Sequence, residues 1–246
     1  MSNLLLWLAN LIGLIGFSYP FLGLAADPAA ASVLFFGLVS VALALVVVDV
    51  ASRDLDARVI ALLGVLAAVN AALRLVETTL LVMPGGFSPV FLLIILVGYA
   101  FGGRLGFLYG ALSLLASALV TGGLGPWLPF QMMAAAWIGL GAGGLPHPAH
   151  PRLRDALLAG YGALWGLLFG ALMNLYFWPY FSGAEGWTAG LAPGEALRRY
   201  AAFYLVTSLG WDALRAVGNV VLLMALASPL LRILERFRLR MGHVRV

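Results

Sequence analysis

Arg74 stands in the middle of a long apolar segment, and two further polar side chains follow it at helical spacing. Asn70, Arg74 and Glu77 fall at positions i, i+4 and i+7, which lie on one face of a helix. A guanidinium at the centre of a bilayer costs about 2.5–3.5 kcal/mol or more unless it is paired or hydrated. Glu77 is the expected partner because it lies within one turn. This face therefore offers a cation, an anion and an amide that a polar solute could contact.

A second arginine, Arg215, repeats this arrangement near the other end of the chain. Asp212, Arg215 and Asn219 fall at i, i+3 and i+7, again on one helical face. Each set could be a self-neutralising pair that pins one helix to another. Alternatively, the two sets could line a polar cavity that opens to the outside and receives a polar solute. We favour the cavity because two such faces occur together.

Other side chains could complete such a cavity. Gln131 and Asn174 are amides within apolar segments, where a lone amide more often forms an interhelical hydrogen bond. Trp127 and Trp178 could offer apolar faces to a planar ligand or belong to the aromatic belt of a membrane protein. The glycine-rich segment 180–197 fits either a mobile gate over the cavity or a plain linker.

The amino-acid composition indicates the environment in which these residues lie. The chain has 246 residues, of which 63% are hydrophobic and 10% are charged. A soluble domain carries about 25% charged residues. The composition therefore excludes a soluble enzyme, a nucleic-acid-binding module and a disordered chain. It predicts an all-α, polytopic membrane helix bundle whose exterior faces the lipid bilayer.

Eight apolar segments predict eight helices. No Asp, Glu, Lys or Arg occurs in residues 105–151, and this stretch divides at the helix-breaking glycines and proline of 122–126. The expected helices are 4–24, 31–50, 57–82, 89–101, 105–121, 127–144, 155–178 and 198–231. We expect the first to be a retained helix and not a cleaved signal peptide, because it lacks a basic leading region.

The distribution of arginine tests this count through the positive-inside rule. With the N-terminus inside, ten arginines lie in cytoplasmic segments and two, Arg198 and Arg199, lie outside. The sequence thus predicts a multi-pass protein of a prokaryotic cytoplasmic membrane with both termini cytoplasmic. The ten cytoplasmic arginines are Arg53, Arg58, Arg104, Arg152, Arg154, Arg232, Arg236, Arg238, Arg240 and Arg245.

Several kinds of chemistry have no signature here. The sequence has no cysteine, no Walker A loop and no spacing typical of metal ligands. Ser113, Ser117 and Ser208 have no credible histidine partner. We therefore expect no enzymatic activity, no cofactor and no metal. Two further alternatives remain open: an ion-coupled secondary carrier in which Glu77 or Asp212 carries protons, and a non-transporting subunit of a membrane assembly.

Four motifs stand out between residues 86 and 219. They are GFSPVF at 86–91, GYAFGGRLGFLYGAL at 98–112, TGGLGPWLPFQ at 121–131 and TSLGWDALRAVGN at 207–219. Together they resemble the substrate-binding S-component of energy-coupling factor (ECF) vitamin transporters, and the resemblance covers about residues 57–240.

The resemblance implies a six-helix substrate-binding core at 53–246, with residues 1–52 forming two extra N-terminal transmembrane helices. It also implies a transmembrane coupling subunit and two cytoplasmic ATPase subunits as partners. The family's Ala-x-x-x-Ala docking motif matches Ala57 and Ala61, although a register of Ala61 with Val65 is also conceivable. The loop 122–127 resembles that of members assigned to cobalamin or its precursors. A smaller anionic heterocycle would instead suit Arg74 or Arg215.

Overall fold

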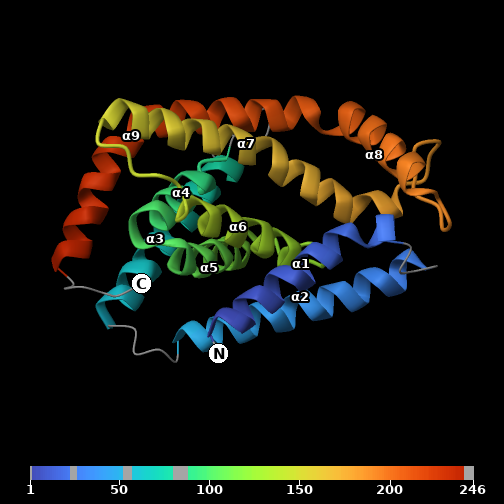
Figure 1. Ribbon diagram of the computed structural model, residues 1–246, viewed down its shortest axis with the longest axis horizontal. Coiled ribbons are helices and arrows are strands. Elements are labelled where there is room, and N and C mark those ends of the chain that lie inside the picture. Colours follow the sequence, from blue (N-terminus) through green and yellow to red (C-terminus); the bar gives the residue numbers. More distant parts are fainter. Residues whose placement is uncertain (1, 23–26, 52–56, 80–87, 241–246) are drawn as a thin grey trace.

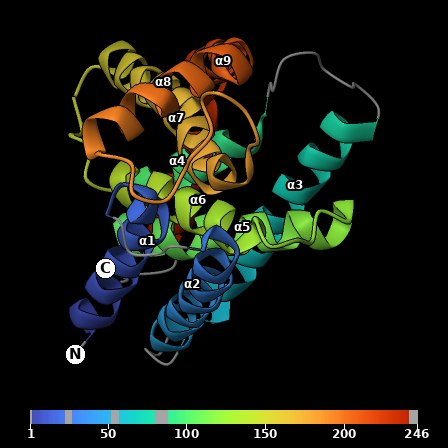
Figure 2. The same ribbon diagram turned by 90° about the vertical axis from the view of Figure 1, so that its right-hand side faces the viewer.

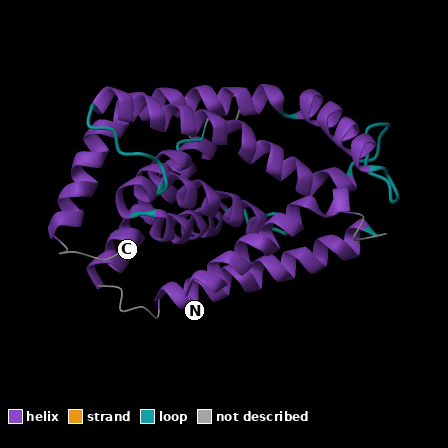
Figure 3. Ribbon diagram, viewed as in Figure 1, coloured by secondary structure: helices purple, strands orange, loops and turns teal. Residues whose placement is uncertain are grey.

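A computed structural model describes residues 2–22, 27–51, 57–79 and 88–240, and within these ranges the regular structure is entirely helical (Figure 3). The all-α membrane bundle expected from the sequence is therefore confirmed. The helices are α1 (Ser2–Leu22), α2 (Pro28–Ala51), α3 (Ala57–Thr79), α4 (Val90–Phe101), α5 (Gly103–Thr121), α6 (Leu128–Ala142), α7 (Pro151–Phe177), the 3-10 turn η1 (Trp178–Tyr180), α8 (Pro193–Thr207) and α9 (Leu209–Arg240).

The helices form three tiers in both side views (Figures 1 and 2). Helices α7, α8 and α9 lie along one side, α1 and α2 along the other, and α4, α5 and α6 between them. Figure 2 also shows that the C-terminal end of α3 stands apart from α7 and α9. Short α4 is the centre of the molecule, and each of its residues is buried. The uninterrupted apolar sequence of α4 fits a helix that is covered on all sides.

Glycine allows the middle tier to pack closely. A Cβ atom on Gly106 would overlap the backbone of Gly139, and a Cβ atom on Gly139 would overlap the backbone of Gly106. Helices α5 and α6 therefore cross with their backbones in direct contact, as small residues permit in membranes. Gly102 separates α4 from α5 with a φ of 93°, a conformation that side chains with a Cβ disfavour.

The exterior is apolar, as a bilayer requires. Trp7 and Val33 are each 73% exposed. Among the described residues, five helices are long and apolar enough to cross a membrane, and three shorter apolar helices accompany them. The chain is a multi-pass membrane protein.

The last predicted helix, 198–231, is wrong in its boundaries. The structure has two helices there, α8 and α9, which meet at Ser208 with φ −134° and ψ −25°. Helix α9 then continues to Arg240 with Pro229 in its interior. Its end turns across the bundle (Figure 1), where the Arg238 guanidinium donates a hydrogen bond to the Ala100 carbonyl at 2.9 Å.

Helices α1 and α2 are packed into the bundle. Phe17 of α1 meets Phe130 of α6 edge-on with ring centroids 5.2 Å apart. The indole nitrogen of Trp137 in α6 donates to Asn10 Oδ1 at 2.5 Å. A buried cluster of α1, α2, α5 and α6 side chains surrounds these contacts. The two N-terminal helices therefore contribute to the interior of the protein as well as to its lipid-facing surface.

Candidate functional site

The polar face of α3 faces α4 and α5. Asn70 is fully buried, and its amide nitrogen donates to the Val90 carbonyl at 3.1 Å and to Ser113 Oγ at 2.5 Å. The carbonyl oxygen Oδ1 of Asn70 accepts no hydrogen bond within the described part of the chain. Asn70 therefore holds three helices together and keeps one buried acceptor unused, which is uncommon in proteins.

Arg74 and Glu77 lie further along the same face, toward the C-terminal end of α3. Ser88, just before α4, donates its hydroxyl proton to Glu77 Oε2 at 3.2 Å. Arg74 interacts electrostatically with Glu77 and also with Arg215 of α9. The charge of Arg215 therefore reaches Arg74, but it acts on Arg74 less than burial and Glu77 do.

The polar face of α9 is directed at α7. Arg215 Nη1 pairs with Asp212 Oδ1 at 2.5 Å and donates to the Gly166 carbonyl at 3.2 Å. Asn219 Nδ2 donates to the Gly162 carbonyl at 2.8 Å. The Arg215 guanidinium also lies 5.6 Å from the centre of the Phe169 ring, within the range of a cation–π contact. Asp212, Arg215 and Asn219 thus join α9 to α7 along a full helical face.

Three glycines of α7 provide the space for these side chains. Gly162, Gly166 and Gly170 follow one another at intervals of four and line the face toward α9. A Cβ atom at Gly170 would overlap the carboxylate of Asp212, and one at Gly166 would overlap the backbone of Ala216. We did not predict this role from the sequence. The i, i+4, i+8 glycine spacing within an apolar segment is the signal that could have revealed it.

The remaining predicted ligand contacts are more scattered. Trp127 precedes α6, is 43% exposed and donates its indole proton to the Gly123 carbonyl at 3.2 Å. Gln131 of α6 and Asn174 of α7 are half-buried. The part of these three side chains in a binding site stays a prediction.

Trp178 is fully buried in a cluster with Trp187, Ala196 and Phe203. Its ring stacks on Phe21 of α1 with centroids 5.7 Å apart, and Tyr200 of α8 meets it edge-on at 5.5 Å. Its indole nitrogen donates to the Glu185 carbonyl at 2.7 Å. A ligand can therefore reach this ring only after Phe21 or Tyr200 moves.

The segment between η1 and α8 is attached to α1 in this conformation. Trp187 is 8% exposed and donates its indole proton to the Pro20 carbonyl at 3.2 Å. Together with the Phe21–Trp178 stack, this contact holds the segment against the first helix. A gate at this position would have to break both contacts in order to open.

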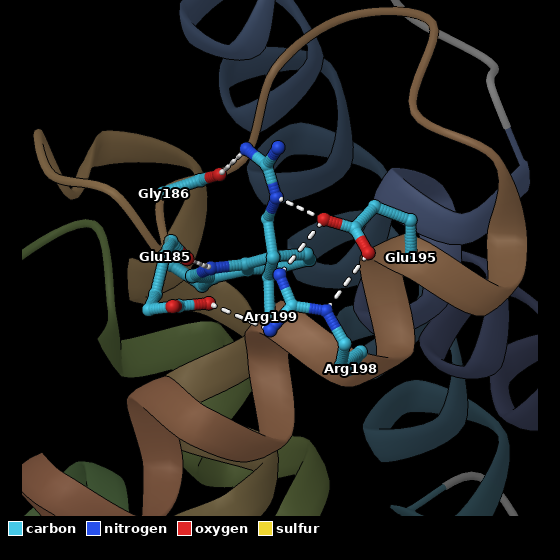
Figure 4. A network of polar contacts seen from close by, with 6 residues as sticks. Glu185, Gly186, Glu195, Arg198 and Arg199 are labelled. Carbon is cyan, nitrogen blue, oxygen red and sulfur yellow. Dashed lines mark hydrogen bonds and ion pairs between the residues drawn. The ribbon is translucent and has the colours of Figure 1, made fainter.

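Arg198 and Arg199 are neutralised beside this segment (Figure 4). Arg198 Nε and Arg199 Nε donate to the two carboxylate oxygens of Glu195 at 2.8 and 2.7 Å, and Arg198 also lies 3.8 Å from Glu185. Hydrogen bonds from Arg198, and then those from Arg199, lower the pKa of Glu195 to about 2. The bidentate geometry explains why both guanidiniums can share one carboxylate.

The face of α3 that carries the docking motif is open. Ala57 and Ala61 are exposed, and a Cβ atom at Gly64 would meet no atom within 4 Å. Val65, the alternative in the motif, is 62% exposed on the same side. Because α3 presents this small-residue surface and packs its opposite face on α5, the helix leaves room for another helix to approach.

The charged and amide side chains of α3 and α9 could bind a polar solute. In the described ranges, no group of three or more His, Asp or Glu side chains could hold a metal ion. Guanidiniums, carboxylates and amides in an apolar bundle instead provide oriented donors and acceptors for a polar solute.

Comparison with known families gives one match. The family model described as ECF transporter, substrate-specific component, matches residues 58–227, from the beginning of α3 into α9. The match begins after α1 and α2 and includes both charged faces. No curated protein and no solved structure matches the chain.

Proposed function

This chain belongs to the substrate-specific components of ECF transporters, and we propose that it captures a vitamin or a related micronutrient for ATP-driven uptake. Membership makes it a subunit of a transporter and not an enzyme. The nutrient would enter from the outside and bind between α3, α7 and α9. Cobalamin or a precursor is the first candidate, because of the resemblance of the 122–127 loop.

The observation that carries this proposal is that α3 and α9 each hold a half-buried arginine beside a carboxylate, Arg74 with Glu77 and Arg215 with Asp212. A helix bundle that only needed to span the bilayer would have no use for Arg74 and Glu77, which are costly in an apolar environment. Asp212, Arg215 and Asn219 already bind α7, so their main role is to fix that wall of the site. Arg74 and Glu77 are then the charged groups that a nutrient meets first.

The partners follow from the family. A transmembrane coupling subunit would dock on the exposed small-residue face at Ala57 and Ala61, and two cytoplasmic ATPase subunits would drive release. Release requires work, because a ligand enclosed by polar groups in a dry site dissociates slowly. The chain would reside in a prokaryotic cytoplasmic membrane with both termini on the cytoplasmic side.

Reconstitution tests this function. Proteoliposomes that contain the chain, the coupling subunit and the ATPases of the same genome should accumulate radiolabelled cobalamin, or another vitamin, only with ATP on the cytoplasmic side. The chain alone should bind the vitamin without accumulating it. Accumulation by the chain alone, abolished by an uncoupler, would instead favour the ion-coupled carrier. Failure of both preparations to bind any vitamin would reject the proposal.

A further inference from the structure

Two contacts between α3 and α5 repeat in a common register. Tyr109 Oη donates to the Leu66 carbonyl at 3.0 Å, and Asn70 Nδ2 donates to Ser113 Oγ at 2.5 Å. In each contact the partners are 43 residues apart, and the second contact lies one turn beyond the first on both helices. Because α-helices advance four residues in about one turn, the next position in this register places Arg74 opposite Ser117.

Ser117 has a buried hydroxyl group without a partner. Its side chain is 1% exposed, and Oγ makes no hydrogen bond within the described residues. Serine and threonine in a helix commonly bond to the carbonyl four residues earlier. Ser40 and Thr121 do so in this protein, at 2.8 Å each. Ser117 therefore leaves unused a bond that comparable residues of the same chain make.

Asn70 adds a second unused group one turn deeper. Its carbonyl oxygen Oδ1 has no partner among the described residues, and the side chain is fully buried. The orientation of the amide is fixed because Nδ2, the only donor of the side chain, must face the Val90 carbonyl. Two buried polar atoms on facing turns, both without partners, cost stability unless something else satisfies them.

We propose that Ser117 Oγ and Asn70 Oδ1 bind the nutrient and select its chemical class. Asn70 Oδ1 can only accept, so the ligand must present an N–H or O–H donor to it. Arg74 can only donate, so the ligand must also present an anionic group or a carbonyl about one helical turn, roughly 5.4 Å, further out. The class is therefore a nutrient that bears an N–H or O–H donor together with a separate acceptor, and not a simple anion. This inference rests on the proposed function.

A first test needs no ligand. Removing a hydroxyl group that lacks a partner should not destabilise the empty protein, whereas removing one that is hydrogen-bonded should. In the purified, ligand-free protein we expect Ser117→Ala to keep or raise the apparent melting temperature. Ser113→Ala, which removes the acceptor of Asn70, should lower it. Ser40→Ala is the control, because it makes the same substitution in α2, a helix remote from the site. A loss for Ser117→Ala as large as that for Ser113→Ala would assign Ser117 to packing and overturn the inference.

A second test uses radiolabelled cobalamin, riboflavin, thiamine, biotin and folate as probes, each of which carries N–H donors. For any probe that the wild-type protein binds, Ser117→Ala should raise the dissociation constant about two- to tenfold, the range expected for one hydrogen bond. Ser40→Ala should leave it unchanged. An unchanged constant for Ser117→Ala would overturn the inference while leaving the proposed function intact. Binding of no probe by the wild-type protein would count against the proposed function, and the melting temperatures would then decide the role of Ser117.

Discussion

The carboxylate of Asp212 lies in the space that a Cβ atom on residue 170 would fill, so Gly170 and Asp212 fit against each other across the α7–α9 interface. This contact places Asp212 where it can pair with Arg215. Glycine is therefore required at residue 170 for the geometry of a charged pair on another helix.

Gly170→Ala should destabilise the protein because the added methyl group displaces the Asp212 carboxylate. We expect a loss of about 1–3 kcal/mol, the range for overpacking a filled interior, measured as a lower apparent melting temperature. Gly160→Ala is the matched control in the same helix, where a Cβ atom would meet no atom within 4 Å. The control should be neutral or slightly stabilising, because alanine favours a helix over glycine. Equal effects of the two variants would contradict the contact.

Removing Arg215 should be more harmful than removing both members of its pair. Asp212 is 2% exposed, and Arg215→Met leaves its carboxylate without a cation. Leaving one charge of a buried pair uncompensated costs about 3–5 kcal/mol. Adding Asp212→Asn removes that charge and should restore part of the melting temperature. If the loss of stability in the double variant equals the sum of the losses in the two single variants, the two side chains do not act as a pair.

The Glu195 network should persist to unusually low pH. The pKa of Glu195 is lowered from its ordinary 4.5 to about 2 by hydrogen bonds from Arg198 and Arg199. A carboxylate with a lowered pKa contributes stability above its unfolded value and loses that contribution as the pH falls toward its folded value. The difference in melting temperature between the wild-type protein and Glu195→Gln should thus be constant from pH 7 to about 5 and shrink from about pH 4.5 to 2. A difference that does not change between pH 5 and pH 2 would mean that the pKa of Glu195 is not lowered.

Bulky residues on the exposed face of α3 should block assembly and spare ligand binding. Close helix contacts in membranes require small residues at the interface. Ala57→Trp or Ala61→Trp would therefore hold the coupling subunit away from the α3 backbone. Val33→Trp, at a 73% exposed position of α2, is a control for adding an indole to a lipid-facing surface. Co-purification of the coupling subunit should be lost only with the α3 variants. Loss of vitamin binding in those variants would mean that this face of α3 is not the docking surface.

The features of the site that depend on local periodicity could be predicted from the sequence, whereas those that depend on long-range packing could not. Asn70, Arg74 and Glu77 share a face because their spacing alone determines it, and the structure places them so. The partner of Asn219 was not predictable in this way, because the Gly162 carbonyl becomes its acceptor only when α7 lies against α9.

Two other features depended on the rest of the fold. No proline marks the break at Ser208, so the apolar run 198–231 indicated a single helix. The sequence left Trp178 open as an apolar face for a ligand or a member of the aromatic belt. The structure stacks its ring on Phe21 of α1. Such burial depends on which helices pack together, and no local pattern encodes it.

Native mass spectrometry of the protein purified from cells grown in rich medium tests the central claim most directly. The account predicts that the wild-type protein carries one small nutrient per chain, and that folded Arg74→Ala carries none. Equal occupancy in the two proteins, or none in either after incubation with the vitamin probes, would contradict the claim that Arg74 belongs to a nutrient-binding site.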